Sequence, residues 1–237
     1  MLAVQLLIDG ILLGGTYVLI AQSLNLVFGV MGVVNLAHGS FIVLAGLFTI
    51  WFAAHVAVSP LVAVPVAFLV LCAVGTVLQP MLIEPLMKRA PQQAELLSLM
   101  VTFGLDYLLI ELGLQVFGSN YVSLPYLQST LTWHGITIGK SLLVAGLIAG
   151  TLAVLLGLWL NRTNFGKSLL AASQSQIGAV SIGINVRLVR LVAFAVGVGL
   201  AGAAGALLIL VQPMAAETAD NFTILAFVLI ALGGLGD

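Results

Sequence analysis

Seven long apolar segments constrain the fold of this chain more than any other feature of its sequence. A helix that crosses the hydrocarbon core of a membrane needs about 20 mostly apolar residues. Inside that core, only helices and closed barrels satisfy every backbone polar group, and unbroken apolar runs favour helices. The sequence therefore predicts an all-α, polytopic membrane protein. Its predicted spans are residues 6–28, 33–52, 60–84, 94–117, 141–161 and 188–212, with a seventh that begins near Phe222 and runs to Asp237.

The composition agrees with a surface that faces lipid and excludes several other classes of protein. Only 6% of the 237 residues are charged and 62% are hydrophobic, whereas roughly a quarter of the residues of soluble domains are charged. The formal net charge of −1 leaves no basic patch for nucleic acid. With Cys72 as its single cysteine, the chain forms no internal disulfide. Because the first residues contain no Lys or Arg, we expect the first segment to be a retained span and not a signal peptide.

Basic residues give the predicted spans an orientation. Loops on the cytoplasmic side of a membrane tend to hold the Lys and Arg residues. When the spans alternate in direction, six basic residues fall on one side and only Lys140 falls on the other. We therefore expect the N-terminus outside, an outer loop at residues 118–140 and a cytoplasmic segment at residues 162–187. The six residues are Lys88, Arg89, Arg162, Lys167, Arg187 and Arg190.

The predicted outer loop contains a short alternating stretch and several aromatic residues. Residues 133–139 alternate in polarity, which predicts a small hairpin resting on the membrane surface. Tyr121, Tyr126 and Trp133 are typical of the aromatic belt at a membrane interface, and they are equally typical of a surface that docks a partner protein. Both interpretations stay open at this point.

One glycine pattern resembles a dinucleotide-binding motif but lies in the wrong context. Residues 197–202 match G-x-G-x-x-G, which has that meaning only between a strand and a helix. Here the pattern lies inside a predicted span. Small residues four apart, such as Ala201 with Gly205 and Gly10 with Gly14, let membrane helices approach closely. We therefore interpret these residues as packing contacts.

Other fragments of catalytic or metal-binding motifs are incomplete. Residues 139–141 end like a phosphate-binding loop, but His134 stands where that motif requires a glycine. The other two histidines, His38 and His55, are isolated from each other and from any cysteine, so no metal site is predicted. The sequence predicts neither a cofactor nor an enzymatic activity for this chain.

Polar residues in the first span fall on one face. Asp9, Thr16 and Ser23 are seven residues apart, which at about 100° per residue places them nearly in line along a helix. Polar groups at membrane depth usually face other helices or a path for water, so we expect this stripe to point inward. Gln22 and Asn25 add polar groups near its inner end. Thr16, Ser23 and Asn25 are therefore candidates for lining a translocation path, with helix packing as the alternative.

Residues 28–41 interrupt the apolar pattern most clearly. Three glycines and the polar residues Asn35, His38 and Ser40 occur within this stretch. Irregular backbone at membrane depth is tolerated only beside protein or water, and such breaks often mark the substrate region of transporters. Asn35 and His38 therefore join the candidates for the translocation path. The alternative is an ordinary cytoplasmic turn between two spans.

The predicted cytoplasmic segment contains an amphipathic helix. Thr163 or Asn164 can cap this helix at its start. Leu169, Ala172 and Ser173 then share one face of small and apolar side chains. Such a helix could insert into a groove on a soluble partner, or it could lie on the membrane surface.

Three of these stretches, taken in order, resemble the permease subunits of binding-protein-dependent ABC importers for branched-chain amino acids, of the LivH type. The first is Phe-Gly-Val-Met-Gly-Val-Val-Asn-Leu-Ala-His-Gly at residues 28–39. The second runs from Thr-Asn-Phe-Gly at 163–166 to Gly-Ile-Asn at 183–185, and the third is Leu-Gly-Gly-Leu-Gly at 232–236. Members usually carry more charge in the second stretch, and they continue past the third with further spans. Residues 1–237 are thus expected to form a single permease domain that lacks those spans.

The resemblance implies a function and a set of partners. The chain would be an inner-membrane ABC importer permease for branched-chain or related amino acids. It would assemble with a homologous second permease subunit, two cytoplasmic ATPase subunits that hydrolyse ATP, and a periplasmic substrate-binding protein. Residues 163–185 would couple it to the ATPases, with Phe165, Gly166 and Ala172 in the docking helix.

Two other classes of function remain open from the residues themselves. An autonomous secondary transporter or channel could use Asp9, Asp106 or Glu111 to carry a coupling ion. Asp106 and Glu111 are about 140° apart on one helix, so they do not form a pair on one face. A purely structural membrane subunit is the third possibility.

Overall fold

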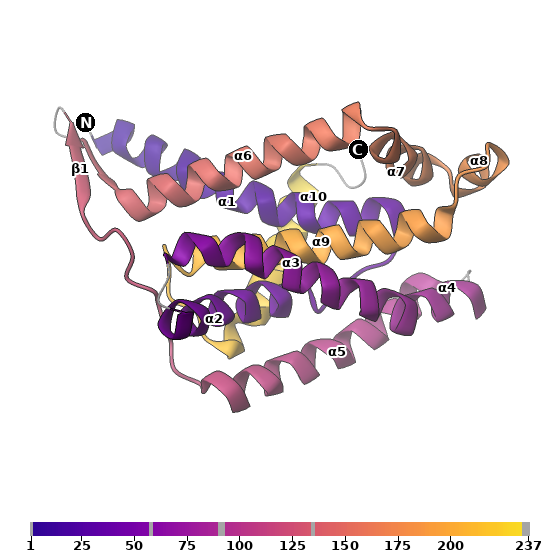
Figure 1. The fold of residues 1–237 in the computed structure, drawn as a ribbon, viewed down its shortest axis with the longest axis horizontal. Helices are drawn as coiled ribbons and strands as arrows, with labels where there is room; N and C mark the ends of the chain where they lie inside the picture. Colours follow the sequence, from indigo (N-terminus) through magenta and orange to yellow (C-terminus); the bar gives the residue numbers. More distant parts are fainter. Residues whose placement is uncertain (1, 57–58, 90–92, 134–135, 234–237) are drawn as a thin grey trace.

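The computed structural model describes residues 2–56, 59–89, 93–133 and 136–233. Within these residues, seven helices are long and apolar enough to cross a membrane, which confirms the predicted all-α, polytopic fold. The helices run side by side along the long axis of the molecule (Figure 1). They are α1 (Leu2–Met31), α2 (His38–Val56), α3 (Pro60–Leu78), α5 (Ala94–Phe117), α6 (Lys140–Arg162), α9 (Val186–Leu208) and α10 (Ala219–Gly233).

The remaining elements are short and lie mainly at the ends of the long helices. A π-helical turn, η1 (Gln79–Ile83), continues α3 into α4 (Glu84–Arg89), and a 3-10 turn, η3 (Ala216–Thr218), precedes α10. The last predicted span therefore begins a few residues earlier than expected. Of the third family motif, only Leu232 and Gly233 lie within the described residues.

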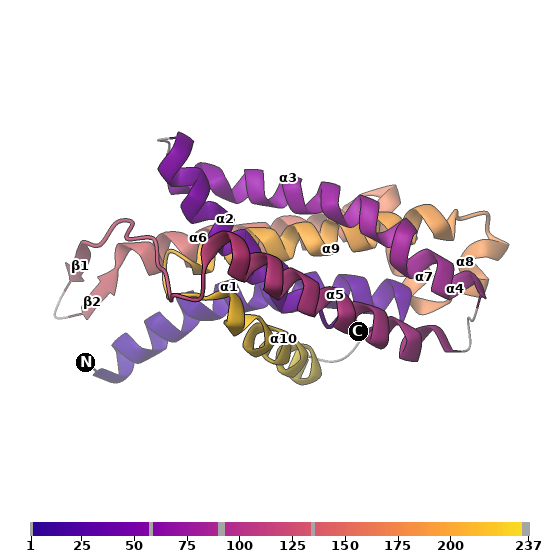
Figure 2. The same ribbon diagram turned by 90° about the horizontal axis from the view of Figure 1, so that it is seen from below.

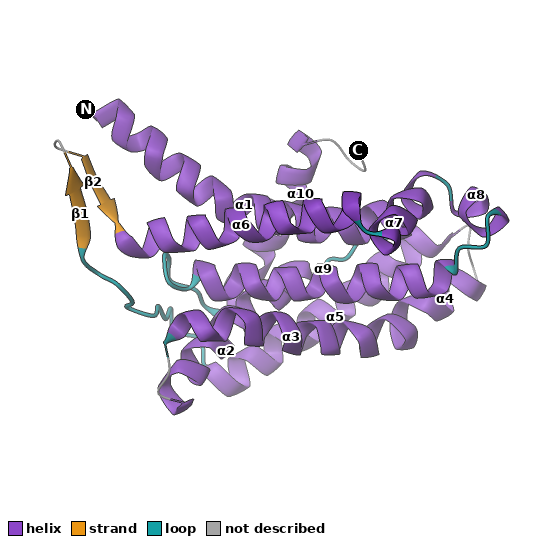
Figure 3. Ribbon diagram, turned by 45° about the horizontal axis from the view of Figure 1, so that its top comes forward, coloured by secondary structure: helices purple, strands orange, loops and turns teal. Residues whose placement is uncertain are grey.

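The predicted hairpin is present at one end of the bundle (Figure 3). Strands β1 (Thr130–Trp133) and β2 (Ile136–Gly139) pair antiparallel, with Thr130 opposite Gly139; His134 and Gly135 lie outside the described residues. The hairpin contacts the start of α1, where the Gln5 side-chain amide donates to the Thr137 carbonyl oxygen at 2.7 Å.

Helix α9 forms the centre of the bundle. Figure 2 shows it between α3 on one side and α1 and α10 on the other. Its glycines sit where neighbouring backbones come closest: a β-carbon at Gly197 would lie 2.8 Å from the Ser23 carbonyl oxygen of α1, and one at Gly202 would lie 2.9 Å from the Ala67 carbonyl oxygen of α3. The pattern that resembled a dinucleotide motif is therefore a set of packing contacts, as predicted.

The packing role predicted for Gly10 and Gly14 is wrong. A β-carbon at either position would meet no atom within 4 Å. The close approach of α1 to α6 occurs instead at Gly15, which faces the backbone of Gly146. Gly10 and Gly14 have the correct spacing, but their face of α1 meets no other helix of the described chain, whereas the adjacent face at Gly15 packs against α6.

The basic residues gather at one end of the bundle, as the alternation of spans predicts. Helices α4, α7 (Asn164–Gln174) and α8 (Gln176–Ser181) lie together at the right-hand end in Figure 1, opposite the N-terminus and the hairpin. Lys88, Arg187 and Arg190 all reach Glu84 at this end. Lys140 lies at the other end, where β2 passes into α6.

Candidate functional site

The chain breaks sharply between α1 and α2. Helix α1 ends at Met31 and not at residue 28 as predicted, and Gly32 then adopts a left-handed backbone with φ of 63°. Residues 32–37, which we call the linker, are not helical, so α2 begins only at His38 and not at residue 33. The predicted boundaries were wrong here because apolarity continues through a segment whose backbone leaves the helix.

The linker carries the chain back into the bundle. The Ser23 hydroxyl lies 2.8 Å from Nε2 of His38, the first residue of α2. Ser23 precedes the end of α1 by eight residues, which is about 12 Å along a helix. Accordingly, α1 extends farther to the right than α2 in Figure 1. The linker thus starts at the exposed Gly32 and returns to Asn35 and His38, which are buried in the bundle. A broken backbone at membrane depth stays a prediction.

Two threonines from distant helices satisfy the backbone around the linker. The Leu36 amide donates to Thr102 Oγ1 on α5 at 3.1 Å. The Gly39 amide donates to Thr223 Oγ1 on α10 at 2.9 Å, and Thr223 Oγ1 donates to the Leu36 carbonyl oxygen at 3.0 Å. Sequence analysis missed both threonines, because a single hydroxyl inside an apolar helix is common and usually bonds to its own helix.

Three polar atoms at the break have no hydrogen-bond partner among the described residues. They are Nδ2 and Oδ1 of Asn35, which is 1% exposed, and Nδ1 of His38, which is 0% exposed. Because the Ser23 hydroxyl donates to the Ile20 carbonyl oxygen at 2.6 Å, His38 Nε2 is the donor to Ser23. His38 Nδ1 is then an acceptor. Most buried polar groups in proteins are paired, so this cluster is a candidate site for a polar ligand.

The structure brings together some of the predicted path residues and separates others. Ser23 and His38 are in contact, and Asn35 lies three residues before His38 in the non-helical linker. Thr16 is fully buried, as the stripe predicted, but its hydroxyl donates to Leu13 of its own helix. Asn25 lines a different cavity.

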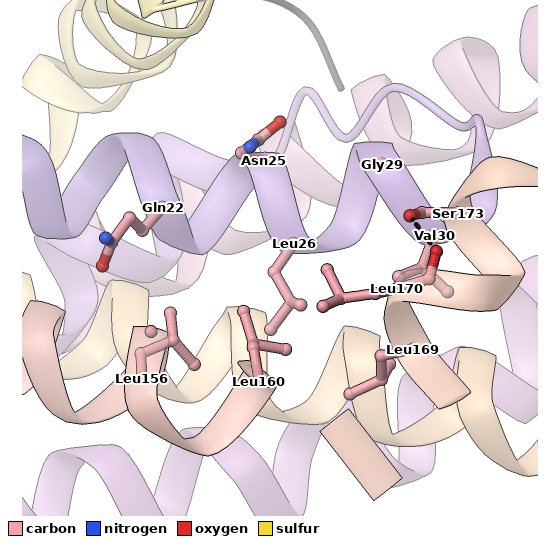
Figure 4. Close-up of a pocket in the computed structure, with 11 residues that line it drawn as sticks. Gln22, Asn25, Leu26, Gly29, Val30, Leu156, Leu160, Leu169, Leu170 and Ser173 are labelled. Atoms are coloured by element: carbon pink, nitrogen blue, oxygen red, sulfur yellow. Dashed lines mark hydrogen bonds between the residues drawn. The ribbon is translucent and has the colours of Figure 1, made fainter. Parts of the chain in front are cut away.

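That cavity lies between α1, α6 and α7 and has a volume of about 190 Å³. Gln22, Asn25, Leu160 and Leu170 are among the residues that line it (Figure 4). Gln22 Oε1 and Asn25 Oδ1 have no hydrogen-bond partner among the described residues. Ser173, also in its wall, donates to Leu170 of its own helix at 2.8 Å. The cavity leaves space beside the packed face of α7.

The carboxylates considered for ion coupling do not meet. Asp106 is buried and accepts a hydrogen bond of 2.5 Å from the Ser40 hydroxyl of α2. Glu111 lies on the exposed side of the same helix, as the angle between them predicted. Within the described residues, no three His, Cys, Asp or Glu side chains are grouped to hold a metal ion.

The predicted amphipathic helix is α7, and its caps are clear. Thr163 Oγ1 accepts from the Gly166 amide at 2.9 Å, so Thr163 is the N-cap and Asn164 is the first helical residue. Leu169 and Ala172 are buried, together with Gly166, and they face the bundle. Gly166 is required for this packing, because a β-carbon there would overlap the backbone of Leu160.

The other coupling residues lie around this packed face. Phe165 is half-buried and its ring lies 6.2 Å from that of Trp159 on α6, and Asn164 is exposed. The coupling role of these residues stays a prediction. The buried residues of α7 hold the helix against the bundle.

Sequence analysis missed an exposed apolar surface on the next helix. Ile177 is 83% exposed, Val180 61% and Ile182 74%. We call these three residues the α8 face. Large apolar side chains exposed together at the surface usually mark an interaction site. The sequence shows the spacing of these residues but not the direction in which they point. Ser175 is the N-cap of α8 and accepts a hydrogen bond from the Gly178 amide. The turn at Ser175 directs the three side chains away from the bundle.

Sequence analysis also missed Glu84. This buried carboxylate lies 3.0 Å from Nη2 of Arg190 on α9, and the Gln79 amide donates to it at 3.1 Å. Lys88 and Arg187 lie within 4 Å. A buried carboxylate is tolerated only when it is paired in this way. Glu84 therefore fixes α4 to the end of α9, beside α8.

Comparisons with known proteins give a consistent result. The model of the family described as the branched-chain amino acid transport system permease component matches residues 6–237. The probable branched-chain amino acid transport permease protein LivH of Methanocaldococcus jannaschii is 28% identical over 243 residues. That alignment covers 98% of this chain and 74% of the relative. No solved structure matches the chain significantly.

Proposed function

Because the chain belongs to the family of branched-chain amino acid transport permeases and is a permease subunit of an ABC importer, we propose that its helix break lines the amino acid path and that its α7–α8 segment docks an ATPase. The family match confirms the resemblance that the three motifs indicated. The chain is accordingly a transport subunit and not an enzyme, and it is a multi-pass membrane protein.

The chemistry of the break supports a path for an amino acid. The ammonium group of an amino acid needs acceptors, which His38 Nδ1 and Asn35 Oδ1 offer. Its carboxylate needs donors, and Asn35 Nδ2 is one. Ser23 orients the His38 ring through Nε2. The unpaired buried atoms of Asn35 and His38 are the observation that carries this proposal, and Thr16 and Asn25 would shape the helix around it.

The partners are proposed from the family. A homologous second permease subunit would complete the path, two cytoplasmic ATPase subunits would bind at the end with the basic residues, and a periplasmic binding protein would deliver substrate to the other end, beside the hairpin. In this proposal the N-terminus lies on the periplasmic side of the inner membrane. Leucine, isoleucine and valine are the proposed substrates, and related amino acids are the alternative.

The α8 face is the proposed contact with the ATPase. Lys167 and Leu170 on the preceding helix α7 are also exposed, and protein interfaces commonly combine an apolar centre with a polar rim. The buried residues Gly166, Leu169 and Ala172 would hold α7 against α6, and Ser173 lies at the cavity beside α1. ATPase dimerisation would then favour one orientation of this segment over another and so shift the permease between two states.

Capture of the cognate ATPase tests the docking proposal. In the complex produced with its partner subunits, I177D and V180D should each reduce the ATPase recovered with the permease at least tenfold, because a charge replaces a buried apolar contact. L131D, which changes an exposed apolar residue of the hairpin, is the matched control and should leave recovery unchanged. Full recovery with both α8 variants would contradict the proposal.

Amino acid uptake distinguishes the two remaining classes of function. An autonomous transporter would carry its coupling ion on Asp9, Asp106 or Glu111, of which Asp106 and Glu111 lie on different sides of α5. Uptake by the purified chain without an ATPase would establish an autonomous transporter. Normal uptake by the complex after H38A and N35A would place the path elsewhere.

A further inference from the structure

We propose that Gln176 is a positioning residue that transmits movement of α8 to the helix break, with Gly32 as the hinge. This inference rests on the proposed docking of an ATPase at the α8 face. It assigns a role in transport to a residue that belongs neither to the proposed substrate path nor to the three residues of the α8 face.

The first observation is a hydrogen bond between the two regions. Gln176 Nε2 donates to the Val30 carbonyl oxygen at 3.2 Å, across 146 residues of sequence. In the described part of the chain, this bond is the one side-chain hydrogen bond between α8 and α1. The last carbonyl groups of a helix have no partner within it, so Gln176 satisfies a group that the break at Gly32 leaves free. Gln176 adjoins Ile177 of the α8 face, so a force on that face acts directly on this bond.

The second observation is the geometry of Gly32. Its φ of 63° lies in the left-handed region, where a β-carbon costs free energy and glycine does not. A β-carbon built there would nevertheless meet no atom within 4 Å. Backbone conformation and not space therefore requires glycine at this position. A glycine between a helix end and an extended segment can absorb large dihedral changes, as hinges do.

The third observation is the room beside this contact. A cavity of about 260 Å³ lies against Met31, Gly32, Val33 and Gln176, and Arg190 closes one wall. The lining of this cavity is mainly polar, unlike the apolar cavities between α3 and its neighbouring helices. The end of α1 can therefore move toward α4 and α5 without displacing a packed core.

The covalent chain carries such a movement to the path. Only two residues separate Gly32 from Asn35, and His38 directly follows the linker. The bonds to Thr102 and Thr223 hold the linker in its present arrangement. Displacement of Val30 would have to shift Gly32 and so strain these bonds, which would change the surroundings of Asn35 and His38. Allosteric coupling requires an element of this kind, with two arrangements that both sites influence.

Coupling of ATP hydrolysis to uptake tests this inference in the complex assembled with its partner subunits in lipid vesicles. Q176L keeps the side-chain volume and removes the donor. We expect ATPase recovery and ATP hydrolysis to stay within twofold of the wild type, while amino acid uptake per ATP hydrolysed falls about tenfold, the change associated with one hydrogen bond. Q115L, which changes an exposed glutamine of α5 outside the proposed docking segment, is the matched control and should leave this ratio unchanged.

The hinge has its own pair of variants. G32A should lower uptake per ATP at least as far as Q176L, whereas G29A, in open space within helical α1, should not. Because G32A could also impair folding, the result with Q176L decides. An unchanged ratio in Q176L would overturn the inference, as would loss of the ATPase from that variant, since Gln176 would then belong to the docking surface. Failure of the docking proposal is a separate result, namely retention of the ATPase by I177D.

Discussion

The centre of α9 and the linker at residues 32–37 are both marked by glycine, yet glycine has opposite effects in the two regions. In α9 the glycines allow the backbones of three neighbouring helices to come close, and the surrounding side chains are small and apolar. In the linker a single glycine turns the chain out of the helix, and polar side chains follow with unpaired atoms. Glycine in a membrane helix therefore indicates either a fixed contact or a change of direction, and its neighbours in space decide which.

This difference separates a scaffold from a site. Close helix contacts in membranes are stabilised by van der Waals packing, which depends on many atoms in fixed positions. Buried polar atoms without partners are instead costly in one arrangement and become favourable when a partner arrives. We expect substitutions in α9 to lower mainly the stability of the protein, and substitutions at the break to lower mainly amino acid uptake.

The largest loss of stability is expected from G205A. A β-carbon at Gly205 would overlap the backbone of Ile42 on α2, and overpacking of this kind costs on the order of 3 kcal/mol. Unfolding of the purified protein in mixed detergent micelles measures the change. G150A on α6 is the control: its β-carbon would meet nothing within 4 Å, and alanine favours the helix, so stability should not fall. Equal losses in the two variants would remove the distinction between packed and open glycines.

An intermediate loss is expected from T223V. Valine keeps the shape of threonine but leaves the Gly39 amide and the Leu36 carbonyl without the Thr223 hydroxyl, at a cost of about 1–3 kcal/mol. T151V is matched to it, because the exposed Thr151 hydroxyl bonds only to Leu147 of its own helix, and its stability should stay within the error of the same unfolding assay. If T223V also left the free energy of unfolding unchanged, the hydrogen bonds from α10 would not stabilise the linker.

The smallest effect on stability, and the sharpest effect on function, is expected from N35L. Leucine removes two buried polar atoms without partners, so the free energy of unfolding should rise by about 1 kcal/mol. Amino acid uptake by the assembled complex should nevertheless fall at least tenfold. N161L, at an exposed position near the end of α6, should leave uptake unchanged. Normal uptake with N35L would place the path elsewhere.

Sequence reasoning identified the break more accurately than the coupling segment. Asn35 and His38 stood out because they are polar within an apolar run, which is a local property. The face of α7 that contains Leu169 and Ala172 was also identified correctly as a face, but the sequence could not tell whether it points to a partner or to the bundle. The structure turns it to the bundle and leaves the α8 face exposed.

The sequence by itself determined the number of long helices, the gathering of basic residues at one end and the family, because hydrophobic length, charge and motif order are properties of contiguous residues. Only the tertiary structure decided where α2 begins, which glycines pack and which residues serve the break. Those features depend on pairs far apart in the chain, such as Gly39 with Thr223 at a separation of 184 residues and Val30 with Gln176 at 146. A hydrogen bond or a steric contact is defined by distance in space, and no local pattern fixes that distance.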